Sequence, residues 1–230
     1  MLSRLAFPAV CSGCGVSAEP LCSECVAGLR SIGCIPAPAG LEWAAAAFAY
    51  EGAARELIAK MKYHNARAGL GWLAGQIANT ARSAGRVDDI ELVTWPPTTP
   101  ARRRERGFDL AELLARSVAR RLGRPAAVTL SRHGGSAQTG RSRAERSEGP
   151  AFVVRQRRVS GRSVLLVDDV VTTGATLKGA GRALRVGGAS AVAAVVGAHT
   201  TSRSMAAEPT SWERLSIQGA AGREPRRGRA

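Results

Sequence analysis

The chain has 230 residues, of which 45% are hydrophobic and 22% charged, so it can bury a core and wholesale disorder is excluded. All but three of its 33 basic side chains are Arg, and the net charge of +15 favours polyanionic partners: phosphorylated small molecules, nucleic acid or a membrane surface. No apolar run reaches the roughly 18 residues of a membrane span, and no signal-peptide core is present, so we expect a cytosolic protein.

All five cysteines lie in residues 1–40, which we predict to be a separate small domain. Four of them form two C-x-x-C pairs: Cys11, Cys14, Cys22 and Cys25. In a reducing compartment two such pairs offer the tetrahedral thiolate set of a structural zinc ion, and we predict a zinc ribbon. Iron–sulfur or redox use and disulfides are the alternatives. Cys34 is left over, and we expect it to be a small buried apolar residue.

Residues 41–200 alternate between strand-like and helix-like patterns, and we predict them to be the main domain. The expected strands are 43–50, 90–95, 128–131, 151–155, 164–168 and 191–198. The expected helices are 53–63, 70–84, 109–122 and 176–186. This alternation predicts an α/β fold with a mostly parallel sheet flanked by helices. Residues 201–230 have little apolar periodicity, and we predict a disordered basic tail.

The segment after the strand 90–95 is strongly basic. It begins with Pro96 and Pro97 and continues through Thr98 to Gly107, and it carries Arg102, Arg103, Arg104 and Arg106. Guanidinium groups bind phosphate oxygens through two parallel hydrogen bonds, so this segment suits a pyrophosphate. The alternative is a solvated basic turn.

A second basic segment, residues 132–150, is too long to be an idle connection. It carries Gln138, Arg141, Arg143 and Arg146. Loops of this length often close over an active site. The alternative is a disordered insertion.

The most informative segment follows the apolar strand 164–168. Two adjacent acids, Asp168 and Asp169, stand at its carboxyl end, where open α/β sheets bind ligands. A loop of small and hydroxyl residues follows and leads into a helix: Thr172, Thr173, Gly174, Ala175 and Thr176. Loop amides and hydroxyls at a helix N-terminus suit a phosphate, and carboxylates accept hydrogen bonds from sugar hydroxyls. The segment therefore predicts a site for a phosphorylated sugar. The alternative is that the acids only cap the helix.

This segment resembles the phosphoribosyl pyrophosphate (PRPP) signature of type I phosphoribosyltransferases. The resemblance implies that Asp168 and Asp169 contact the ribose hydroxyls and that residues 172–176 cradle the 5′-phosphate.

Within that superfamily the chain resembles the ComF family of competence-associated phosphoribosyltransferase-like proteins. The motifs that carry the likeness are the cysteine pairs, residues 50–63, residues 102–115 and residues 138–146. The resemblance implies a type I phosphoribosyltransferase-like fold with an N-terminal zinc ribbon. It also implies PRPP bound with Mg²⁺, and a link to DNA uptake and the competence machinery. The implied pyrophosphate loop comprises Thr94, Trp95, Pro96, Arg102 and Arg103. The implied catalytic residues, on a flexible hood, are Arg141, Arg143 and Arg146.

Two functions remain open at this point. The first is Mg²⁺-dependent phosphoribosyl transfer from PRPP to an unidentified acceptor. The second is a zinc-containing module that binds single-stranded DNA, with PRPP as a regulatory ligand and no turnover.

Overall fold

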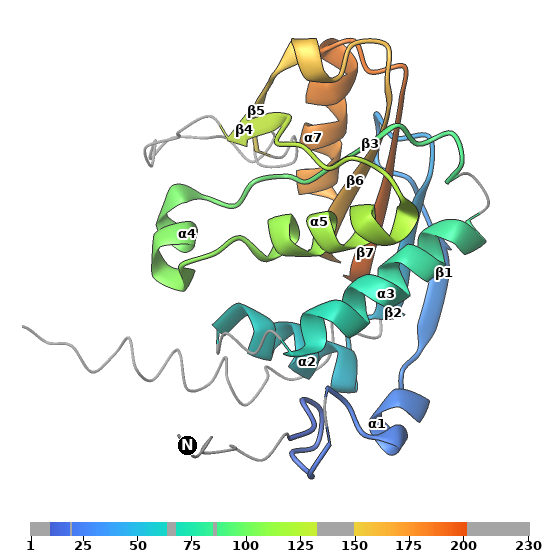
Figure 1. The fold of residues 1–230 in the computed structure, drawn as a ribbon, viewed down its shortest axis with the longest axis vertical. Helices are drawn as coiled ribbons and strands as arrows, with labels where there is room; N and C mark the ends of the chain where they lie inside the picture. Colours follow the sequence, from blue (N-terminus) through green and yellow to red (C-terminus); the bar gives the residue numbers. More distant parts are fainter. Residues whose placement is uncertain (1–9, 19, 64–67, 85–86, 133–149, 202–230) are drawn as a thin grey trace, which may run out of the picture.

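The computed structural model describes residues 10–18, 20–63, 68–84, 87–132 and 150–201. At its centre is a five-stranded sheet with the order β1-β2-β7-β6-β3 (Figure 1). The strands are β1 (Ser31–Ile35), β2 (Ala44–Ala49), β3 (Leu92–Thr94), β6 (Ser163–Val171) and β7 (Ala191–His199). All neighbours in the sheet are parallel except β1, which pairs antiparallel with β2. The predicted mostly parallel sheet is therefore confirmed.

Helices cover both faces of this sheet, as predicted. Helices α3 (Ala68–Ser83) and α5 (Leu110–Leu122) pack on one face. Helix α7 (Ala175–Val186) packs on the other, beside the two-stranded ladder of β4 (Leu130–Arg132) and β5 (Phe152–Val154). Three shorter elements are α1 (Ser23–Ala27), α4 (Pro100–Arg106) and the 3₁₀ turn Gln156–Arg158. Helix α2 (Gly52–Tyr63) lies at the end of the sheet toward which β6 and β7 run (Figure 1).

The sheet divides the core into two apolar clusters. Along β6, Leu165 and Val167 face the cluster under α3 and α5, whereas Val164 and Leu166 face the cluster under α7. Every residue of β2 is buried, because a parallel strand covered on both faces exposes neither side. The chain thus builds its core from Ala, Val and Leu, as its low aromatic content requires.

Four described elements were not expected from the sequence: α1, β1, α4 and the 3₁₀ turn Gln156–Arg158. Because β1 belongs to the central sheet, the N-terminal segment is continuous with the main fold at that strand. The division at residue 40 stays a prediction. In the described part of the chain, no helix is both long and apolar enough to cross a bilayer.

Candidate functional site

A pocket of about 400 Å³ opens at the carboxyl end of β6. Helix α2 contributes one wall, α4 and the start of α5 contribute a second, and the last residues of β6 with the following loop form the floor. Its polar and charged lining comprises Tyr50, Lys62, Tyr63, Thr98, Arg102, Arg106, Asp109, Arg132, Asp168, Asp169, Thr172 and Thr176. The pocket therefore lies at the sheet edge where the sequence predicts a ligand site.

The two predicted acids lie inside β6, because the strand continues to Val171 rather than ending at Asp168. Both line the pocket, and the backbone N–H of Asp169 donates to Oδ1 of Asp168 over 2.8 Å. Burial raises the pKa of Asp168 well above its usual range, and the neighbouring charge of Asp169 adds to this effect. The pair thus holds carboxylates where solvent stabilises them poorly.

Lys62 lies against this acid pair, although sequence reasoning gave it no role. Its Nζ is 2.8 Å from Oδ1 of Asp169, and both side chains are less than one-fifth exposed. Burial alone would lower the pKa of Lys62, but the charge of Asp169 and its hydrogen bond outweigh burial and raise that pKa. The signal that could have found this residue is the rarity of lysine in an arginine-rich chain.

The predicted phosphate loop connects β6 to α7, which begins at Ala175. Gly174 caps the helix with φ +74°, a left-handed conformation that favours glycine, and the N–H of Ala175 donates to Oγ1 of Thr173 over 3.4 Å. Thr172 and Thr176 line the main pocket.

The loop also lines a second cavity of about 380 Å³. Thr172 is common to both cavities, and Thr173, Gly174 and Ala175 line the second one. The opposite wall of this cavity is the segment 35–39 that joins β1 to β2. A Cβ at Gly174 would lie 3.1 Å from Cγ of Pro38, so the segment is in close contact with the loop.

The predicted pyrophosphate loop is only partly brought into the pocket. Pro96 and Arg102 line it. The Thr94 side chain is fully buried, and its Oγ1 donates to the Ala127 carbonyl over 2.9 Å. Trp95 is also buried, with the Arg116 guanidinium 5.0 Å from its ring centroid. Neither side chain lines the pocket.

Arg103 points elsewhere, because Thr98 to Gly107 is not the irregular loop that the sequence predicts. Thr99 accepts from the backbone N–H of Arg102, Pro100 opens α4, and Gly107 ends it with φ 75°. On this helix Arg103 is exposed and pairs with Glu112 over 3.3 Å, whereas Arg102 faces the pocket.

Arg106 of the predicted basic segment and Arg132, which was not predicted, complete the basic side of the pocket. The Arg106 guanidinium lies 5.0 Å from the Tyr63 ring centroid, and its Nε is buried without a hydrogen-bond partner among the described residues. Arg132 lies over the Phe152 ring. Burial lowers the pKa of Arg132, and the like charge of Arg102 lowers it further. The pocket thus has an acidic floor and a basic side, a distribution suited to a polyhydroxylated anion.

The predicted hood arginines Arg141, Arg143 and Arg146 lie outside the described residues. The residues on either side of that segment are described. Arg132 in β4 pairs with Phe152 in β5, so the two ends of the segment lie next to each other. Arg132 also lines the pocket.

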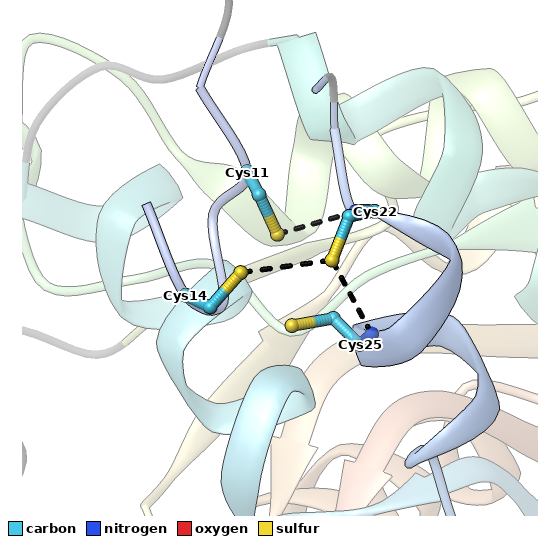
Figure 2. Close-up of side chains that lie close together, drawn as sticks. All are labelled: Cys11, Cys14, Cys22 and Cys25. Carbon is cyan, nitrogen blue, oxygen red and sulfur yellow. Dashed lines mark hydrogen bonds between the residues drawn. The ribbon is translucent and has the colours of Figure 1, made fainter. Parts of the chain in front are cut away.

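The four predicted metal ligands lie together, and Figure 2 shows their sulfur atoms pointing toward a common centre. All four Sγ atoms are within 4.8 Å of one another, and those of Cys14 and Cys22 are 3.6 Å apart. Tetrahedral zinc with Zn–S bonds of about 2.3 Å needs sulfurs roughly 3.8 Å apart. The donor set therefore fits zinc.

The backbone around the cysteines also fits such a site. The N–H groups of Gly13 and Cys22 donate to Sγ of Cys11 over 3.4 and 3.2 Å. A Cβ at Gly13 would lie 2.6 Å from Sγ of Cys25, so only glycine leaves room for that sulfur. Burial alone would raise the pKa of Cys11, but backbone hydrogen bonds lower it to about 6. Burial raises the pKa of Cys25 to about 12. Cys34, expected to be buried, is exposed on β1, because β1 is an edge strand.

Residues 106–218 match the phosphoribosyl transferase domain family. No curated protein matches the chain. Among solved structures the chain is similar to glutamine phosphoribosylpyrophosphate amidotransferase from B. subtilis, with 24% identity and a TM-score of 0.40 over 55% of this chain and 25% of that one. It is similar to phosphoribosylpyrophosphate synthetase from Mycobacterium smegmatis, with 22% identity and a TM-score of 0.34 over 59% of this chain and 35% of that one. It is also similar to hypoxanthine phosphoribosyl transferase from Trypanosoma cruzi, with 19% identity and a TM-score of 0.34 over 63% of this chain and 69% of that one.

The chain thus spans about a quarter of the amidotransferase and about a third of the synthetase. The matched range contains β6, the loop after it and α7, which carry the acid pair and the glycine-capped turn. The chain therefore carries a phosphoribosyltransferase-like domain.

Proposed function

We propose that the main pocket binds PRPP and that the chain is a phosphoribosyltransferase-like protein of the ComF type, linked to DNA uptake in natural transformation. The observation that carries this proposal is that the acid pair of β6 and two hydroxyl residues after it, Thr172 and Thr176, line one pocket opposite a basic wall. Ribose hydroxyls would donate to Asp168 and Asp169, and residues 172–176 would hold the 5′-phosphate through loop amides and hydroxyls. The pyrophosphate would then face Pro96 and Arg102.

Transfer in this pocket would break the bond between C1′ of ribose and the pyrophosphate oxygen, which keeps the electron pair, and form a bond from C1′ to a nucleophilic acceptor. Hard oxygen donors suit Mg²⁺, and the pocket offers the Asp168 carboxylate beside the ligand's own oxygens. When bound there, the ion neutralises charge on the departing pyrophosphate. Arg141, Arg143 and Arg146 of the predicted hood would exclude water, which otherwise competes with the acceptor.

Calorimetric titration with PRPP and Mg²⁺ tests the ligand. We expect binding by the wild type and at least about a hundredfold weaker binding by the Asp168→Asn/Asp169→Asn variant, since several charge-assisted hydrogen bonds are lost. Asp88 and Asp89 are exposed adjacent acids, so Asp88→Asn/Asp89→Asn removes the same charge away from the pocket. Equal binding by the wild type and the β6 variant, or binding by neither, contradicts the proposal.

Turnover is tested separately by pyrophosphate release with a panel of nucleobases and amines. Release that requires an acceptor supports a pentosyltransferase. PRPP binding without release for any acceptor supports the alternative, in which PRPP regulates a module that binds single-stranded DNA. The cytosolic location and the competence-machinery partners stay predictions.

One surface favours the DNA-binding alternative. A groove of about 460 Å³ along α5 is lined by Arg116, Arg120 and Arg124 between the apolar side chains of Leu70 and Leu113. Phosphate contacts make binding fall steeply with salt. If the groove binds single-stranded DNA, affinity falls by at least about tenfold between low and physiological salt, and Arg120→Gln reduces that dependence. Undetectable or salt-independent binding contradicts this alternative.

A further inference from the structure

Lys62 has no part in the proposed function, yet it makes the ion pair of the acid floor. It lies in the last turn of α2, and its Nζ reaches Oδ1 of Asp169 over 2.8 Å. Its side chain is 18% exposed, so the contact is shielded from water and from screening by salt.

The surroundings explain why a cation is needed at this point. Asp168 and Asp169 are adjacent and both line the pocket, and the charge of Asp169 disfavours ionisation of Asp168. Two carboxylates that must both accept hydrogen bonds therefore need a neighbouring positive charge. A divalent cation is one way to supply that charge, and a buried ammonium group is another.

An ammonium group and a divalent cation at the same carboxylate repel each other, and the charge that one supplies weakens the attraction for the other. Mg²⁺ requires near-octahedral oxygen ligands at about 2.1 Å and keeps several waters. Lys62 already holds Oδ1 of Asp169. A carboxylate has a second oxygen with its own lone pairs, which stays available to a sugar hydroxyl.

We propose that Lys62 is a positioning residue that supplies, at Asp169, the positive charge a metal ion would otherwise supply. The ribose end of the ligand then binds without a metal ion on Asp169. Mg²⁺ is needed only for the pyrophosphate end. This inference rests on the proposed function, because it assigns ribose to the acid pair.

Ribose 5-phosphate is the probe that separates the two ends, because it lacks the pyrophosphate. We expect the wild type to bind it with the same affinity in Mg²⁺ and in EDTA. Lys62→Gln should weaken binding in EDTA by at least about tenfold, since the acid pair loses its partner. Adding Mg²⁺ should restore most of that loss, which a merely structural role of Lys62 would not produce.

Two further variants complete the design. Lys62→Arg keeps the charge and should bind as the wild type does within about threefold. Lys60→Gln removes a lysine from the same helix outside the pocket lining and should leave binding unchanged. A wild type that needs Mg²⁺ for ribose 5-phosphate overturns the inference without any variant. A loss of ribose 5-phosphate affinity in Lys62→Gln that Mg²⁺ does not restore also overturns the inference.

A metal titration distinguishes failure of this inference from failure of the proposed function. If the wild type binds neither ribose 5-phosphate nor PRPP, the proposed function fails. The proposal that Lys62 replaces a metal ion at Asp169 is then tested by titrating the protein with Mn²⁺ and measuring Mn²⁺ binding by electron paramagnetic resonance. Mn²⁺ binding by Lys62→Gln but not by the wild type supports it, and equal binding by both overturns it.

Discussion

At the residue scale, Asp168 links the chemistry of the pocket to the stability of the fold. Its raised pKa means that burial disfavours its ionised form in the folded state. A carboxyl whose pKa is higher in the folded state than in the unfolded state contributes its full stability at a pH below its pKa in the unfolded state. That contribution is lost as the pH rises through its pKa in the folded state. At neutral pH Asp168 therefore costs stability, as functional groups in pockets often do.

Asp168→Asn should accordingly raise the Tm at neutral pH by roughly 2–4 °C, the shift that about 1 kcal/mol produces in a domain of this size. The gain should vanish as the pH falls below the usual aspartate range, because the wild-type carboxyl is then protonated in both states. Thermal unfolding followed by circular dichroism across pH measures this difference. Asp88→Asn, at an exposed position, should show no such gain. A Tm that is unchanged or lower in Asp168→Asn at neutral pH contradicts the account.

Sequence patterns predicted part of the pocket at this scale. Asp168 and Asp169 lie near the carboxyl end of β6 and Thr172 and Thr176 follow it, so the strand brings all four to one edge of the sheet. Lys62 comes from a different element, so its contact with Asp169 depends on how α2 packs, which no local pattern reveals.

At the element scale, the predicted main helices and strands are confirmed where apolar periodicity is strong, as in α5 with its buried Leu114 and Val118. Helix α4 was missed because it has no buried residue. Strand β1 was missed because an edge strand with mixed burial has no regular alternation. Cys34 in β1 is exposed for the same reason.

Asp109 is the residue that joins two elements at the pocket. Its Oδ1 accepts from the backbone N–H groups of Ala111 and Glu112 at the start of α5, and its Oδ2 accepts from Thr98 over 2.8 Å. Burial raises the pKa of Asp109. Through these hydrogen bonds Asp109 caps α5 and also holds the turn that precedes α4.

Asp109→Ala should lower the free energy of unfolding by about 1–2 kcal/mol, the usual cost of losing an N-cap. Asp109→Asn keeps an oxygen for the cap and should cost less. Urea denaturation measures both. An alanine variant as stable as the wild type would show that the cap contributes nothing.

At the scale of the whole molecule, the cysteine cluster packs against the main fold. Cys11 is fully buried and belongs, with Leu21, to the same apolar cluster as α3 and α5. A Cβ at Gly13 would lie 3.1 Å from Cβ of Ala53 in α2, so the first cysteine pair packs on that helix. The predicted metal site is thus in direct packing contact with α2, the helix that forms one wall of the pocket.

Removing the metal should therefore destabilise the whole chain rather than the N-terminal segment alone. We expect zinc bound at one ion per chain, and chelation should lower the Tm by at least about 5 °C in a single transition. Elemental analysis and scanning calorimetry measure both. Cys14→Ser should reproduce the loss, whereas Cys34→Ser should retain the zinc. An unchanged Tm after complete chelation contradicts the account.

A crystal structure of the chain with PRPP and Mg²⁺ would show which residues hold each part of the ligand. We predict ribose hydroxyls on Asp168 and Asp169, the 5′-phosphate on residues 172–176, and the pyrophosphate toward Arg102. Ligand density outside the main pocket, with Asp168 and Asp169 uncontacted, would contradict this prediction.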